Sequence, residues 1–131
     1  MRILRLADRD SEPSDPNTFT GNAQLTRMTG LSADPKIHAY RVEFEPAART
    51  AWHTHSGPQI LIVINGCCRL QRHGKPLTEI IAGDVVCIKP RERHWHGAGP
   101  DSPMTHVAIN IDSTTTWLEK VTETEYVGAF R

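Results

Sequence analysis

The sequence predicts an all-β domain, a barrel or a sandwich. Short segments rich in β-branched residues recur about every ten residues, and turns containing glycine or proline separate them. Only the last part of the chain carries apolar residues at helical spacing. This pattern favours antiparallel strands over alternating strands and helices.

The first third is expected to contain three strands. The second and third should be joined by a turn, and a proline-containing surface connector should follow the first. The last of these strands is best defined, because Tyr40, Val42 and Phe44 share one face and charged residues share the other. In chain order the expected elements are strand 1–9, connector 10–17, strand 23–28, turn 30–35 and strand 37–44.

The middle of the chain opens with residues 60–64, which are all apolar and mostly β-branched. They predict a strand that is buried on both faces. Asn65-Gly66 follows as the strongest hairpin signal in the chain. Further strands are expected over 67–72, 77–81, 85–88 and 105–111.

The C-terminal segment, 114–127, is expected to be helical. Trp117, Leu118 and Val121 lie at helical spacing, and Thr122 with Glu125 three residues later is a capping-box pattern. The β-rich core would therefore end in a short helical turn.

Length and charge limit the possible functions. The 131 residues predict one domain, 1–131, and fifteen basic residues balance fifteen acidic ones. Without a basic stripe we expect no nucleic-acid partner, and without a long apolar run we expect no membrane partner and a cytoplasmic location. The three cysteines show no disulfide-type spacing and are expected to be thiols.

The histidines carry the chemistry. His53 and His55 are two residues apart on an extended segment, so their side chains share a face, and Gln59 follows at the edge of the next strand. A second pair, His94 and His96, has the same spacing, and a single histidine lies at position 106. Burying this many imidazoles without partners would cost about 1–3 kcal/mol each, which favours a metal site.

His94 can complete a ligand set with His53, His55 and Gln59, which leaves His96 for acid–base chemistry. Such a neutral set suits a divalent first-row ion with open positions better than a closed structural zinc site. Because no carboxylate offsets its charge, the ion would remain a strong Lewis acid.

These motifs resemble those of the cupins. Phe44-Glu45-Pro46, His53-x-His55-x-x-x-Gln59 and Gly66 are similar to the first cupin motif, and Gly83-Asp84-Val85-Val86, Pro90 and His94 are similar to the second. Gln59 stands where most cupins have glutamate. That departure is shared with a small single-domain branch that includes manganese-dependent hydroxynitrile lyases and carboxymuconolactone-decarboxylase-linked cupins.

The resemblance implies a double-stranded β-helix, the cupin jelly-roll barrel, with residues 1–20 as N-terminal strand and connector and 38–111 as the metal-binding core. It implies metal ligands His53, His55, Gln59 and His94, and Mn²⁺ as the ion, with Fe²⁺, Zn²⁺ and Ni²⁺ as alternatives. His96 and His106 would face the open positions as catalytic residues. The expected substrate pocket is lined by Tyr40, Val42, Cys87 and Asn110, with Cys68 nearby.

Three functions are compatible with such a site. A lyase of hydroxynitrile-lyase type would use the ion as Lewis acid and a histidine as acid and base. A cupin dioxygenase would bind iron at the same ligands, and a third possibility is a metal-containing binding protein without turnover. In each case we expect a small-molecule partner. An exposed apolar edge from the first strands and the C-terminal turn favours a homo-oligomer, a dimer or a tetramer.

Overall fold

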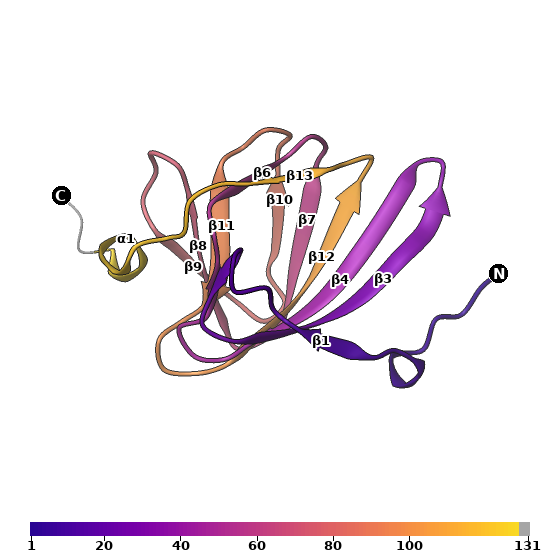
Figure 1. The fold of residues 1–131 in the computed structure, drawn as a ribbon, viewed down its shortest axis with the longest axis horizontal. Helices are drawn as coiled ribbons and strands as arrows, with labels where there is room; N and C mark the ends of the chain where they lie inside the picture. The colour runs from indigo at the N-terminus through magenta and orange to yellow at the C-terminus, as the bar shows by residue number, and fades with distance from the viewer. Residues whose placement is uncertain (129–131) are drawn as a thin grey trace.

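The computed structural model describes residues 1–128, which form two antiparallel sheets facing each other as a jelly-roll-like sandwich (Figure 1). The expected all-β class is confirmed. The six-stranded sheet is ordered β1 (Ser11–Pro13), β3 (Ala23–Ala33), β4 (Lys36–Phe44), β12 (Met104–Ile111), β7 (Gln59–Asn65), β10 (Val85–Ile88). The second sheet is ordered β13 (Thr115–Trp117), β6 (His53–His55), β11 (His94–Ala98), β5 (Arg49–Thr50), β2 (Phe19–Thr20), while β8 (Cys67–Arg72) pairs with β11 and with β9 (Thr78–Ile81).

The main core fills one end of the space between the sheets. Alternation along the strands turns one face of each sheet inward, and apolar side chains from both sheets meet there. Phe44 and Val63 come from the first sheet, Cys68 and Ala98 from the second, and all are buried. The polar residues of the site lie next to this core and are held by the same strands.

The Asn65-Gly66 turn is not a hairpin. It joins β7, which pairs with β12 and β10, to β8, which pairs with β11 and β9 in the other sheet. Gly66 has a positive φ of 81°, and a Cβ there would lie 2.3 Å from the carbonyl oxygen of Pro103. A turn signal specifies local backbone geometry, and here the chain uses it to cross between sheets.

The first part of the chain differs from expectation. Residues 1–9 contain a 3₁₀ turn, Leu6–Asp8, in place of a strand. The expected connector contains strand β1, which pairs at the edge with β3, a position that tolerates proline. Strand β3 extends to Ala33, with a register shift between Met28 and Ser32, so that only residues 34 and 35 of the expected turn 30–35 form a turn.

Residues 60–64 were expected to be buried on both faces, and that prediction was wrong. Leu61 and Val63 point into the core, whereas Ile60 and Ile62 are only partly buried and Ile64 is 49% exposed. An apolar run on a strand therefore indicated burial of one face only.

The C-terminal segment is helical only in its second half. Residues 115–117 form β13, which pairs with β6, and helix α1 is limited to Glu123–Val127. The predicted capping box between Thr122 and Glu125 is present. Within residues 1–128, no helix is long and apolar enough to cross a membrane.

Helix α1 covers the outer side of the second sheet. Tyr126 packs with Trp52, Trp95 and Val121, and its hydroxyl donates a 2.7 Å hydrogen bond to the carbonyl of Ala98. The two tryptophans adjoin site histidines in sequence but point away from them, because neighbouring residues of a strand face opposite sides. They brace the strands that carry the histidines.

Candidate metal centre

Two strands of the second sheet bring the first three histidines together. His53 and His55 lie on the inner face of β6, and His94 on β11 is the direct partner of His53 in the antiparallel register. The ring centroids of His53 and His94 are 4.2 Å apart, and those of His53 and His55 are 5.0 Å apart. All three side chains are buried.

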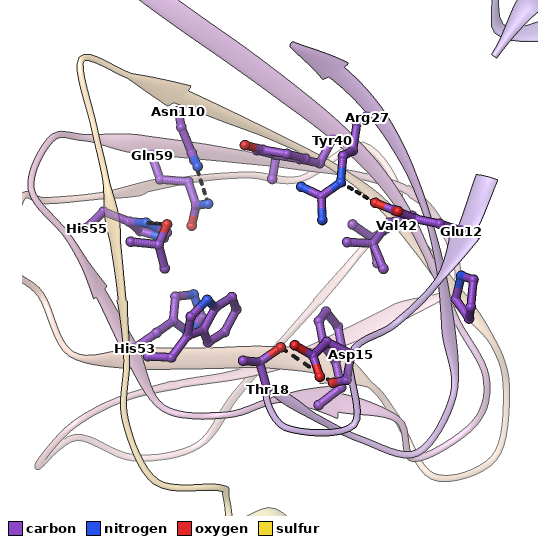
Figure 2. Close-up of a pocket in the computed structure, with 16 residues that line it drawn as sticks. Glu12, Asp15, Thr18, Arg27, Tyr40, Val42, His53, His55, Gln59 and Asn110 are labelled. Atoms are coloured by element: carbon purple, nitrogen blue, oxygen red, sulfur yellow. Dashed lines mark hydrogen bonds and ion pairs between the residues drawn. The ribbon is translucent and has the colours of Figure 1, made fainter. Parts of the chain in front are cut away.

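The opposite sheet supplies an amide. Gln59 is the first residue of β7, and its partner across to β12 is Asn110. Nε2 of Gln59 donates a 2.7 Å hydrogen bond to Oδ1 of Asn110. Figure 2 shows Gln59 and Asn110 at the side of the cavity where His55 stands, with His53 below them.

Backbone carbonyl oxygens fix the tautomers of His53 and His94. Nδ1 of His53 donates to the carbonyl of Ala51 at 2.8 Å, and Nδ1 of His94 donates to the carbonyl of Glu92 at 2.8 Å. Nδ1 of His55 lies 2.9 Å from the hydroxyl of Thr115. A neutral imidazole that is protonated on Nδ1 keeps its Nε2 lone pair free, as a metal ligand requires.

Several buried atoms around this point lack a hydrogen-bond partner within residues 1–128. Among them are Nε2 of His55, Nε2 of His94, Nε2 of His96 and Oε1 of Gln59. Buried polar atoms are normally paired, so several unpaired acceptors in one cluster call for a ligand. These are lone-pair donors of the kind that divalent transition ions bind, and the residues present therefore fit a metal ion.

His96 lies closer to this cluster than the sequence suggested. The candidate ligand atoms of His53, His94 and His96 all lie within 4.8 Å of one another. His55 is outside that group of three, although its ring centroid is 5.3 Å from that of His94. Three histidines are therefore positioned to bind a metal, and His96 belongs to that triad.

A second histidine contact lies behind the triad. Nε2 of His106 is 2.9 Å from Nδ1 of His96, and the two rings meet edge to face. Phe44 packs on both rings, with centroid distances of 6.4 Å to His96 and 5.1 Å to His106. Phe44 therefore covers one side of the His96–His106 pair, and His96 connects the pair to His53 and His94.

Burial keeps these imidazoles neutral. It lowers the pKa of His55 to about 4 and that of His106 to about 4. For His53 and His96 burial likewise lowers the pKa well below the usual value, and neighbouring histidines add to the effect. Among residues 1–128 no carboxylate is buried, so nothing within the cluster offsets a cation's charge.

A cavity of about 490 Å³ opens beside the cluster. His53, His55 and Gln59 line one end, and Figure 2 shows Glu12, Asp15 and Arg27 around the other. Arg27 pairs with Glu12, and its guanidinium stands 5.6 Å from the centroid of the Tyr40 ring. The end of the cavity at Glu12, Asp15 and Arg27 is therefore polar. The wall between that end and the histidines is aromatic and aliphatic, at Tyr40 and Val42.

Tyr40, Val42 and Asn110 line this cavity, as the sequence suggested. Cys87 does not: it is exposed, on the outer face of β10, and lines a separate hollow of about 260 Å³. Cys68 is buried in the core, where burial raises the pKa of its thiol to about 12. Alternation along β10 turns Val86 and Ile88 inward and Cys87 outward, so the expected place of Cys87 in the pocket lining was wrong.

Sequence reasoning missed several residues of the cavity. Glu12, Asp15 and Thr18 lie in or beside the expected surface connector, and Thr115 and Trp117 lie in the segment that was expected to be helical. Asp15 and Thr18 lie outside strands, and β1 and β13 have only three residues each, which is too short for a periodic pattern to develop.

Residues 40–110 match the Cupin domain model. An (R)-mandelonitrile lyase from Granulicella tundricola is 41% identical over 129 residues, covering 96% of this chain and 98% of that protein. The crystal structure of a cupin-like protein from Thermotoga maritima superposes with a TM-score of 0.83 at 41% identity, covering 87% of this chain and 89% of that one. A polyketide cyclase from Streptomyces resistomycificus shares the fold, with a TM-score of 0.71 at 17% identity over 96% of this chain and 90% of its own.

Proposed function

This chain belongs to the cupin family, and from that premise we propose that it is a metal-dependent lyase of hydroxynitrile-lyase type. It would cleave a cyanohydrin or a related hydroxy compound reversibly. The observation that carries the proposal is the cluster of neutral donor atoms without a buried carboxylate, backed by the His96–His106 pair. The similarity to the mandelonitrile lyase supports the same reaction class.

The proposed metal ligands are His53, His55, Gln59 and His94. His96 belongs to the close triad, but we assign it to acid–base chemistry because its Nδ1 contacts His106 and not an oxygen atom. His53 and His94 each donate Nδ1–H to a backbone carbonyl, which leaves Nε2 for the ion. His55 would bind through Nε2 with Nδ1–H donated to the Thr115 hydroxyl, and Gln59 would bind through Oε1. Mn²⁺ is the proposed ion, with Fe²⁺, Zn²⁺ and Ni²⁺ as alternatives. When bound, the ion supplies a Lewis acid that favours the alkoxide form of a substrate hydroxyl.

The histidine pair moves the proton. With its Nδ1–H donated to Nε2 of His106, His96 has a free lone pair on Nε2 beside the ligand atoms of His53 and His94. It can take the hydroxyl proton as the carbon–carbon bond to cyanide breaks, and His106 can share the resulting charge. The same proton then leaves with cyanide as hydrogen cyanide, so an aldehyde forms and the pair is unchanged.

The cavity suits a small substrate. Its volume is near the lower end of the usual range for ligand sites, about 300–1,000 Å³. Tyr40 and Val42 offer an apolar wall for an aromatic or aliphatic substituent, and Asn110 borders the same space.

We also propose that the protein is cytoplasmic and that it forms a homo-oligomer, either a dimer or a tetramer. Exposed apolar residues such as Ile3, Leu6 and Trp117 favour self-association.

The deciding experiment is an assay under nitrogen. Protein loaded with Mn²⁺ is mixed with mandelonitrile, and benzaldehyde is followed by its ultraviolet absorbance. A lyase releases aldehyde and hydrogen cyanide without consuming oxygen. Turnover that requires oxygen would instead assign the chain to the dioxygenases, and binding without turnover of a panel of hydroxy compounds would assign a binding role.

A further inference from the structure

We propose that Asn110 is a positioning residue for the metal centre, because it fixes which end of the Gln59 side-chain amide faces the histidines. The inference rests on the proposed role of Gln59 as a metal ligand. It explains how an amide side chain can bind the ion at position 59. Asn110 touches neither the histidine nitrogens nor the ion in this scheme. It acts through Gln59.

The two side chains are held against each other. Gln59 and Asn110 are direct partners across β7 and β12, and both point to the inner face of the sheet. Nε2 of Gln59 donates to Oδ1 of Asn110 at 2.7 Å, with exposed fractions of 3% and 7% for the two residues. Buried amide groups normally keep a hydrogen-bond partner, and here each serves the other.

An amide ligand must be oriented, whereas a carboxylate need not be. Only the oxygen of a glutamine side chain has lone pairs for a cation, and its NH₂ group is a donor alone. Either oxygen of a carboxylate can bind. A glutamine at position 59 therefore needs an acceptor next to its nitrogen, so that a half-turn of the amide loses a hydrogen bond.

Asn110 provides that acceptor. Because Nε2 is bound to Oδ1 of Asn110, Oε1 points the other way, where it is buried and has no partner within residues 1–128. A half-turn of Gln59 alone would put two amide oxygens against each other and turn N–H groups toward the proposed ion. The hydrogen bond thus holds the chelating atom in place before a metal arrives.

The test measures metal affinity. Metal-free protein is titrated with Mn²⁺, and the free ion is followed by electron paramagnetic resonance. Asn110→Leu, which keeps a branched side chain of four heavy atoms but removes the acceptor, is expected to weaken Mn²⁺ binding about 10–100-fold, the usual effect of losing a group that orients a ligand. Asn110→Asp keeps an acceptor at this position and is expected to bind Mn²⁺ at least as tightly as the unmodified protein.

The decisive comparison uses a carboxylate at position 59. In the Gln59→Glu background, Asn110→Leu is expected to change the affinity by less than about threefold, since no amide has to be oriented. Asn65→Leu, on the exposed end of β7, is the matched control. Unfolding of each metal-free variant is recorded, and Asn110→Ala replaces Asn110→Leu if the leucine variant does not fold.

Equal affinity of Asn110→Leu and the unmodified chain would overturn the inference. So would an equal loss with glutamine at position 59 and in the Gln59→Glu background, because that result indicates packing alone. Failure of the unmodified chain to bind Mn²⁺, Fe²⁺, Zn²⁺ or Ni²⁺ would overturn the proposed metal centre itself. That outcome is visible before any variant is made.

Discussion

Nδ1 of His96 and Nε2 of His106 lie 2.9 Å apart, and neither side chain is more than 5% exposed. Two neutral imidazoles at this distance share one proton, so the tautomer of each determines the tautomer of the other. When His96 presents a lone pair to the cluster on Nε2, His106 must accept on Nε2 and carry its proton on Nδ1. Removing one ring therefore changes the chemistry of the other.

Substitutions of His53 and His106 should separate metal binding from proton transfer. His53→Ala is expected to empty the metal site, because His53 faces both His55 and His94. His106→Ala should keep the metal and lose most turnover, since general acid–base catalysis contributes about 10²–10⁴-fold. Metal content by mass spectrometry and the aldehyde-release assay check both; an inactive, metal-free protein in both cases would contradict this division of roles.

Thr115 should matter for metal affinity. Its hydroxyl lies 2.9 Å from Nδ1 of His55 and holds that ring, so Thr115→Val is expected to weaken metal binding about tenfold. Thr116→Val is the matched control, because Thr116 is exposed on the same strand. Calorimetric titration of both variants with Mn²⁺ measures the difference, and identical affinities would show that the hydroxyl does not support His55.

The metal-free protein should lose stability as the pH falls from about 6.5 to 4. Burial lowers the pKa of His55 and of His106 to about 4, whereas the unfolded chain has ordinary histidines near 6.5. Between pH 6.5 and 4 the unfolded state binds more protons than the folded state. The free energy of unfolding therefore decreases as the pH is lowered, by at most about 1.4 kcal/mol per pH unit for each histidine. Above pH 6.5 these groups contribute no slope. Denaturant unfolding in chelator at several pH values tests this, and His106→Phe should reduce the slope.

Gly97 should be intolerant of a side chain. It lies on β11 between the strand positions of His96 and Ala98, and a Cβ there would meet the carbonyl oxygen of Ala48 at 2.4 Å and Cα of Arg49 at 2.6 Å. Gly97→Ala is expected to destabilise the fold by about 1–3 kcal/mol or more, because β5 would have to move. Gly99→Ala, whose nearest contact would be 4.0 Å away, is the control in thermal unfolding. Equal melting temperatures would contradict the close approach of the two strands.

Much of the fold could be read from the sequence where the pattern was long enough. The strands 37–44 and 85–88 and the capping box at Thr122 were predicted closely, since alternation and cap residues act locally. The His-x-His spacing also placed His53 and His55 on one inner face, because that follows from strand geometry alone.

The features that the sequence did not predict depend on which strands pair with each other and in which register. Asn65-Gly66 has hairpin chemistry, but its flanking strands find better partners in two different sheets. The same holds for His96: only the register of β11 against β6 shows that it joins His53 and His94, and no spacing rule contains that information. Cys87 could not be placed either, because a shift of one residue exchanges the two faces of a strand.

Strand β6, which carries His53 and His55, has both of its neighbours later in the chain. It pairs with β11 through His94 and with β13 through residues 115–117. On the ribosome, a chain grown only to Gln59 would hold three of the four proposed ligands and none of the strands that flank them. An ion could therefore be held at the proposed site only once residues 115–117 are available to pair with β6, so the ligands and the strands that flank them would be assembled together.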